Sequence, residues 1–221
     1  MSDVDKTISE GKPKKSPSRR RVAIHEAGHV IAAVAMGEAS RISIATIEAE
    51  TLSLNGGDEL PPDVSGLVRL EDLIVSAHSA FDRTRFLILM MGGCEAERHA
   101  YRDAALFLRL AGSRDDYETG LTLLRAAHQG LLAVDPELAK RVIEDELIQG
   151  RKTAGKVIRQ HWSAVEAVAD ALVIRRTMER KDLVRVIEGI DPDLLDDSEE
   201  SVAARAGAVM LSSPLGKGGS R

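Results

Sequence analysis

The chain has 221 residues, of which 43% are hydrophobic, 29% are charged and only 3% are aromatic, and its formal net charge is −5. These values predict one globular domain with flexible ends, and the negative charge argues against a nucleic-acid-binding surface over the whole domain. The single cysteine, Cys94, excludes an intrachain disulfide, fits a reducing compartment and is expected to be a buried, inert thiol. The scarcity of aromatic residues favours a core of packed helices over a β-sandwich.

The first 18 residues are polar, and a basic cluster begins among them at residue 12 and ends at residue 21. We expect a disordered, solvated arm here, with contact to nucleic acid or anionic lipid as the alternative. The N-terminus lacks the apolar h-region of a secretory signal, and the longest apolar run, residues 86–91, is far too short to cross a bilayer. We therefore expect a cytoplasmic protein without a transmembrane segment.

Residues 20–36 contain no proline and are apolar almost all round, which predicts a buried helix that ends near Gly37. Polar and apolar residues then alternate over residues 41–47, which predicts a strand. Turn-forming residues follow at 55–58 and 61–62.

From about Leu70 onward the apolar spacing is helical. Residues 69–91 are predicted to form one or two helices, and Gly92-Gly93 marks either a break or a close-packing point before a helix over residues 94–110. Further helices are predicted over residues 114–129 after an opening Ser113, from Asp135-Pro136 to about 153, over 154–177 and over 180–188. Residues 192–221 are acidic, then rich in Ala, Gly and Ser, and are expected to be mostly disordered.

The buried helix contains His25-Glu26-Ala27-Gly28-His29, an H-E-x-x-H pentapeptide. Two histidines four residues apart face the same side of a helix, so both imidazoles can bind one metal ion, while the glutamate reaches a metal-bound water as general base. Burying these side chains among Val, Ile and Ala is costly without partners, and a metal supplies one. Gly28 disfavours the helix by about 1 kcal/mol relative to alanine, which indicates a close approach by another element or a substrate. A core helix with two hydrogen-bonded histidines and a salt-bridged Glu26 is the alternative.

Catalytic zinc usually takes three protein ligands and a water, so the pentapeptide is incomplete. The extended pattern with a third histidine fails, because Ala32 and Ala35 hold the required positions. Spacing does not choose among the downstream candidates, which are Glu48, Glu50, His78, Glu95, Glu97, His99, Asp115, Asp116 and Glu118.

Three blocks in order, HEAGH at 25–29, LMMGGCEAE at 89–97 and GSRDD at 112–116, resemble the protease domain of the FtsH-type ATP-dependent zinc metalloproteases, peptidase family M41. The resemblance covers roughly residues 20–190 and implies that Asp116 is the third zinc ligand, with Glu95 and Glu97 as surface acids or as acids behind the ligands. Ser113 and Asp116 also fit a capping box at a helix start, a role compatible with metal binding. The family's membrane segments and ATPase module have no counterpart in this chain, the residues after Asp116 lack the usual Ala-Thr, and the loop at 50–65 is unlike the family.

These observations predict a mainly α fold, a helical zinc-metallopeptidase domain with an HExxH helix and a small β element. We expect a basic arm over residues 1–18, the peptidase domain over 19–191 and a tail over 192–221. The expected activity is hydrolysis of peptide bonds with Zn²⁺ held by His25, His29 and Asp116 and with Glu26 as general base.

The expected partner is a protein or peptide substrate, laid as an extended segment along a strand edge near residues 42–47. A separate ATPase and a homo-oligomer stay open as further partners, and no nucleic acid is expected. Site-specific cleavage of one partner protein without a motor is one version of this activity. The alternative function is a catalytically silent metal-binding adaptor or regulatory protein derived from the peptidase fold, against which the intact Glu26 argues because zinc binding does not need it.

Overall fold

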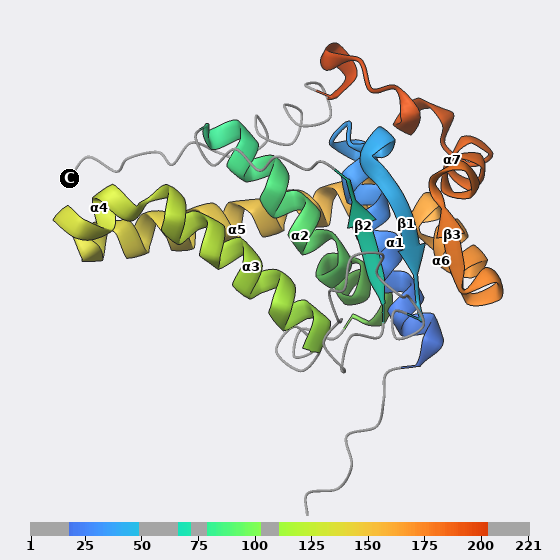
Figure 1. Cartoon of the computed structure of the whole chain (residues 1–221), viewed down its shortest axis with the longest axis horizontal. Helices are drawn as coiled ribbons and strands as arrows, with labels where there is room; N and C mark the ends of the chain where they lie inside the picture. Colours follow the sequence, from blue (N-terminus) through green and yellow to red (C-terminus); the bar gives the residue numbers. More distant parts are fainter. Residues whose placement is uncertain (1–17, 49–65, 72–78, 103–110, 203–221) are drawn as a thin grey trace, which may run out of the picture.

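A computed structural model describes residues 18–48, 66–71, 79–102 and 111–202 (Figure 1). The expectation of a mainly α fold with a small β element is confirmed. The helices are α1 (Arg19–Ala35), α2 (Ala80–Tyr101), α3 (Ala111–Ala127), α4 (Gln129–Val134), α5 (Pro136–Gln160), α6 (Trp162–Arg175) and α7 (Arg180–Glu188), with 3-10 helices η1 (Ala39–Arg41) and η4 (Pro192–Leu195). The strands are β1 (Ile42–Thr46), β2 (Leu67–Leu70) and β3 (Thr177–Glu179).

Helix α1 is the centre of the core, as its apolar sequence predicts. All but a few of its residues are buried, and it packs chiefly against α2 and α6. The sheet lies along α1 on one side, and Figure 1 shows α3 and α5 running away from the sheet, opposite α6 and α7. The helix that carries the H-E-x-x-H motif is therefore enclosed from several directions.

Glycines set the distance between α1 and α2. A Cβ added at Gly28 would overlap the Gly92 carbonyl oxygen and lie 2.7 Å from the Ala96 Cβ, and a Cβ added at Gly92 would lie 2.6 Å from the Gly28 carbonyl oxygen. Neither position has room for a side chain. The close approach expected at Gly28 is therefore confirmed, and its partner is α2.

The sheet has the order β2-β1-β3 with antiparallel pairing on both sides of β1. The predicted strand over residues 41–47 is confirmed as Ile42–Thr46, but the expectation that it offers a free edge is wrong. Both of its sides are hydrogen-bonded, to Leu67–Leu70 and to Thr177–Glu179. Neither partner strand was predicted, because each is too short for alternation to be recognised.

Several predicted helix boundaries are wrong. Leu70 lies in β2, and α2 runs without interruption through Gly92-Gly93, so the glycines mark close packing and not a break. No break occurs at Thr153 either, because α5 continues to Gln160. The start at Asp135-Pro136 is confirmed, since the Asp135 side chain accepts a hydrogen bond from the Leu138 N–H at 3.0 Å.

One ion-pair cluster ties α3 and α4 to the body of the molecule. Arg83 of α2 donates two hydrogen bonds to the Glu146 carboxylate of α5, at 2.8 and 2.9 Å, and the His128 Nε2 at the end of α3 lies 3.0 Å from the same carboxylate. These contacts lower the pKa of Glu146 against the opposing effect of burial. They fix the direction of α3, which carries Asp116.

Packing continues beyond Asp191, where a mostly disordered tail is expected. Leu194 in η4 is 1% exposed, and Val202 packs against Gly37, which has a φ of +77°. Ordered structure therefore extends to Val202, while residues 1–17 of the expected arm and 203–221 of the expected tail lie outside the described residues.

We predict that Gly28→Ala lowers the free energy of unfolding by about 1–3 kcal/mol, because the new methyl group must push α1 and α2 apart. This loss opposes alanine's helix-propensity gain of about 1 kcal/mol. Urea unfolding followed by circular dichroism measures the change. Gly130→Ala is the matched control, since a Cβ at this helical glycine meets no atom within 4 Å and is expected to be neutral or stabilising. Equal stability of Gly28→Ala and wild type would contradict the close contact.

Candidate metal centre

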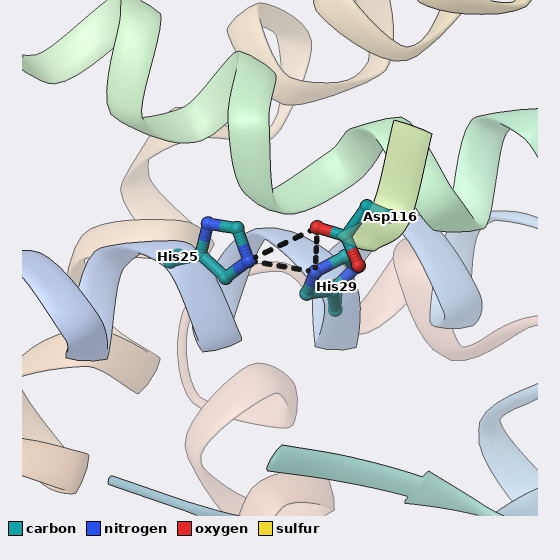
Figure 2. A group of neighbouring side chains, drawn as sticks. All are labelled: His25, His29 and Asp116. Atoms are coloured by element: carbon teal, nitrogen blue, oxygen red, sulfur yellow. Dashed lines mark hydrogen bonds and ion pairs between the residues drawn. The ribbon is translucent and has the colours of Figure 1, made fainter. Parts of the chain in front are cut away.

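His25 and His29 of α1 and Asp116 of α3 bring three ligand atoms together (Figure 2). The two Nε2 atoms are 3.0 Å apart, and each lies 3.2 Å from the Asp116 Oδ2. Among the residues that the structure describes, these three are the one group of His, Cys, Asp or Glu side chains arranged to hold a metal ion. The structure thus brings together the three residues named as ligands from the sequence and the resemblance.

Hydrogen bonds on the far side of each imidazole fix its tautomer. The His25 Nδ1 lies 2.8 Å from the Glu97 Oε1, and the His29 Nδ1 lies 2.8 Å from the Leu89 carbonyl oxygen. Both partners are acceptors, so each Nδ1 carries the hydrogen and donates it. In the neutral rings both Nε2 lone pairs therefore point toward each other and toward a carboxylate oxygen.

Three converging acceptor atoms need a cation between them. Zinc bonded tetrahedrally to nitrogen and oxygen at about 2.0–2.1 Å would hold its ligand atoms roughly 3.3–3.4 Å apart. The observed separations of 3.0, 3.2 and 3.2 Å are close to that requirement. Two imidazoles and one carboxylate are also a donor set suited to catalytic zinc, so the residues fit the ion.

The pKa shifts of the three side chains also indicate that positive charge is favoured at this site. Burial alone lowers the pKa of His25, but hydrogen bonds to Asp116 and Glu97 outweigh it and raise this pKa well above the usual value. The pKa of His29 is likewise raised by Asp116 against burial. Burial would raise the pKa of Asp116, yet the two histidines hold it well below its usual range.

Glu97 and Arg21 stand behind His25. The Glu97 Oε2 accepts a hydrogen bond from the Arg21 Nε at 2.6 Å, while its Oε1 accepts one from His25, and the residue is 3% exposed. The sequence left Glu97 open as a surface acid or an acid behind the ligands, and the geometry selects the second. Sequence reasoning missed Arg21, although its position one helical turn before His25 could have indicated it.

Gly93 leaves the space into which the imidazoles fit. A Cβ at this position of α2 would lie 2.5 Å from the His29 Nε2 and 2.7 Å from the His25 Nε2. The buried thiol of Cys94, the next residue, lies 3.9 Å from the Asp116 Oδ2. Helix α2 therefore forms one wall of the site with its backbone as well as with its side chains.

Glu26 is buried at the same site, with 5% of its surface exposed. Burial raises the pKa of its carboxyl group, and the nearby His25 and His29 oppose that rise. A Cβ at Gly66, the residue before β2, would overlap the Glu26 carboxylate, so this acid lies directly beneath the beginning of an outer strand of the described sheet.

The other candidate ligands lie elsewhere or outside the described residues. Glu95 was expected to be a surface acid or an acid behind the ligands, but it is 1% exposed and pairs with Arg98 and Arg151, so it is not on the surface and the arginines that it pairs with are not ligands. Glu48 pairs with Arg176, and His99 packs against Trp162. Asp115 and Glu118 are exposed on α3, whereas Glu50 and His78 are not among the described residues. Ser113 lies inside α3, which has already begun at Ala111, so the predicted helix start at Ser113 is wrong.

Comparison with known proteins finds a distant relative and no matching family model. The chain is similar to an ATP-dependent zinc metalloprotease FtsH of Rhodococcus erythropolis, with 23% identity over 203 residues. The match covers 78% of this chain but 22% of the relative, so the chain spans about a fifth of that protein's length. The likeness indicates a relationship to FtsH, in agreement with the resemblance carried by the three sequence blocks.

We predict that Glu97→Ala weakens zinc binding roughly 10- to 100-fold, the range typical of removing a residue that orients a metal-binding histidine. The reason is that His25 loses the acceptor that fixes its tautomer. Competition with a chromophoric zinc chelator measures the affinity. Glu118→Ala removes an exposed acid from α3 and should leave it unchanged. Wild-type affinity in Glu97→Ala would show that the His25–Glu97 contact does not prepare the imidazole for metal.

Proposed function

We propose that this protein is a zinc-dependent metalloendopeptidase that hydrolyses peptide bonds. The observation that carries the proposal is the convergence of two tautomer-fixed imidazoles and a carboxylate beside the buried Glu26. Zinc binding alone would not need an acid in that position. The similarity to FtsH supports the same reaction class.

In this proposal His25, His29 and Asp116 hold the zinc ion. When bound, zinc supplies Lewis acidity, which polarises a carbonyl group and makes water more acidic. The protein contributes the rest of the arrangement: Glu97 and the Leu89 carbonyl keep the imidazoles in one tautomer, and α3 presents the carboxylate from the other side.

Glu26 acts as the general base. Its buried carboxylate takes a proton from the attacking water and then delivers that proton to the leaving amine. A raised pKa suits this double role, because a stronger base accepts the proton readily and its conjugate acid still donates to an amine.

The strand beside which a substrate peptide would bind differs from the one expected. Because β1 is paired on both sides, it has no free edge, whereas β2 is an outer strand among the described residues. Its beginning, at Gly66, lies over Glu26. We therefore place an extended peptide beside β2, where main-chain hydrogen bonds would align its scissile bond with the catalytic acid.

A separate question is whether an ATPase delivers substrate to this peptidase. The relative's name describes ATP dependence, but this chain spans only about a fifth of that protein. No helix among the described residues is long and apolar enough to cross a membrane. We propose a cytoplasmic peptidase that works either on accessible segments of a partner protein or with a separate ATPase.

We predict that Asp116→Ala weakens zinc binding by more than the roughly 10- to 100-fold effect of changing a residue that only orients a ligand. One of three protein donors is lost, and both histidines lose the carboxylate that lies 3.2 Å from their Nε2 atoms. Zinc content after dialysis and chelator competition provide the measurement. Asp115→Ala, which changes the exposed neighbouring residue, should bind zinc like wild type. Unchanged zinc affinity in Asp116→Ala would refute the ligand assignment.

We predict that Glu26→Gln keeps zinc but loses cleavage of casein or an unfolded peptide by about 10²- to 10⁴-fold, the usual contribution of general acid–base catalysis. The amide is similar in shape to the carboxylate but does not accept the proton. Glu144→Gln, at an exposed position of α5, is the control. Zinc binding by wild type without any cleavage dependent on Glu26 would instead favour the metal-binding adaptor.

A further inference from the structure

A second polar site lies where the C-terminal ends of α2 and α5 meet. Here Arg98, His99 and Arg102 at the end of α2 and Arg159 at the end of α5 line a cavity of about 330 Å³. This volume is within the range of small-molecule sites and well above the size of one phosphate group. Three of its four lining side chains are arginines, and the Glu95 carboxylate lies next to one of them, Arg98.

The cavity is separate from the metal centre. Helical residues advance by about 100° each, so Arg98, His99 and Arg102 lie roughly 100–200° around the α2 axis from Glu97. Glu97 and Gly93 face the histidines of α1, whereas the cavity faces α5. An anion held there would not contact the zinc ligands.

A glycine near the end of α5, Gly155, lies close to three of the charged side chains beside the cavity. A Cβ at Gly155 would lie 2.8 Å from the Glu95 Oε2, 3.2 Å from an Arg98 nitrogen and 3.3 Å from an Arg159 nitrogen. The side chains of Glu95, Arg98 and Arg159 therefore pack against a position that has no side chain of its own. Glycine is unfavourable inside a helix, and here it leaves the space that these side chains occupy, so that Arg98 of α2 and Arg159 of α5 come close together.

The positive charge is only partly neutralised. Glu95 is the buried acid at the cavity, and its carboxylate is shared by Arg98 and Arg151. Arg102 and Arg159 have no ion-pair partner among the residues that the structure describes. The single negative charge of Glu95 is shared by the two positive charges of Arg98 and Arg151. Arg102 and Arg159 add two more positive charges, which favour a ligand with two negative charges.

The surroundings of His99 agree with this charge balance. The His99 ring packs edge-to-face on Trp162, with 4.5 Å between the ring centroids. Its pKa is lowered first by burial and then by Arg159, Arg98 and Arg102, while Glu166 opposes this shift. A neutral imidazole is thus held at the cavity wall, where it can donate a hydrogen bond without adding another charge.

Basic residues in the last turn of a helix also offset the partial negative charge of its terminal carbonyls. That effect requires no particular direction of the side chains. It does not require arginines from two helices to line one cavity, nor a glycine that lets them approach each other. A ligand accounts for these features together.

We propose that this cavity binds the phosphate monoester group of a small molecule, with Arg98, Arg102 and Arg159 around the phosphate and the remaining volume taken by its organic part. Guanidinium groups match the oxygen geometry of phosphate and can bind it through paired hydrogen bonds. The doubly charged monoester also matches the charge that Arg102 and Arg159 leave uncompensated. The site functions independently of the proposed peptidase activity.

Isothermal titration calorimetry on the full chain at low ionic strength, with O-phosphoserine, inorganic phosphate and succinate as probes, tests the proposal. We expect one O-phosphoserine per chain, bound more tightly than inorganic phosphate or succinate. The double variant Arg102→Gln/Arg159→Gln should bind at least about tenfold more weakly, since each charge-assisted contact contributes about that factor. Arg141→Gln, an exposed arginine on the same α5, should bind like wild type.

Two further measurements separate this site from the metal centre and from unfolding. Removal of zinc by a chelator should leave O-phosphoserine binding unchanged, and circular dichroism should show that the double variant is folded. Arg159→Lys, which keeps the charge but loses the paired hydrogen bonds, should give an intermediate affinity. The proposal is overturned by any of three results: no binding of O-phosphoserine, equal binding by the double variant, or binding that disappears with the zinc. Tighter binding of succinate would overturn the assignment to phosphate.

Discussion

The close approach of α1 and α2 at Gly28, Gly92 and Gly93 is the constraint on which the rest of the site depends. Each glycine disfavours its helix by about 1 kcal/mol relative to alanine. In return the backbones come near enough for the Leu89 carbonyl to reach His29 and for Glu97 to reach His25. Helices with ordinary side chains at these positions would hold the imidazoles away from the groups that orient them. The packing of the core and the chemistry of the site are therefore set by the same contact.

The charges gathered at this contact explain why a divalent cation suits it. With neutral histidines, the carboxylates of Glu26, Glu97 and Asp116 lie near one another, and Arg21 is hydrogen-bonded to one of them, Glu97. Buried negative charge of this kind is costly without a compensating cation. The acids beside His25 and His29 raise the pKa of both imidazoles against the effect of burial, so the same acids that would attract a metal ion also favour protonation. Zinc and protons would therefore compete for the same space, which is the usual coupling at metal sites.

The sequence predicts those features that lie within one segment, and it is weaker where two segments must be compared. The apolar surroundings of His25 and His29 correctly predicted a buried helix, and Asp135-Pro136 correctly predicted the start of α5. Asp116 was singled out through the resemblance, because spacing alone left nine candidates. Periodicity did not reveal that Gly92-Gly93 lies inside a continuous helix, since the reason is a contact with Gly28 more than sixty residues away. The free edge was assigned to β1 for a similar reason: β2 and β3 are too short to recognise, and pairing with them occupies both sides of β1.

Two buried acids on α2 show how one helix serves two sites. Glu95 and Glu97 are two residues apart, so their side chains point to nearly opposite sides of the helix. Glu97 binds His25 and Arg21 of α1, while Glu95 binds Arg98 and Arg151 at the α5 side. The two acids therefore have different roles. Glu97 orients His25, a proposed zinc ligand, whereas Glu95 joins α2 to α5. A ligand in the arginine-lined cavity would lie on the side of α2 that carries Glu95 and away from Glu97. It would influence the metal centre only by moving α2 as a body, and the glycine contact with α1 leaves little room for that movement.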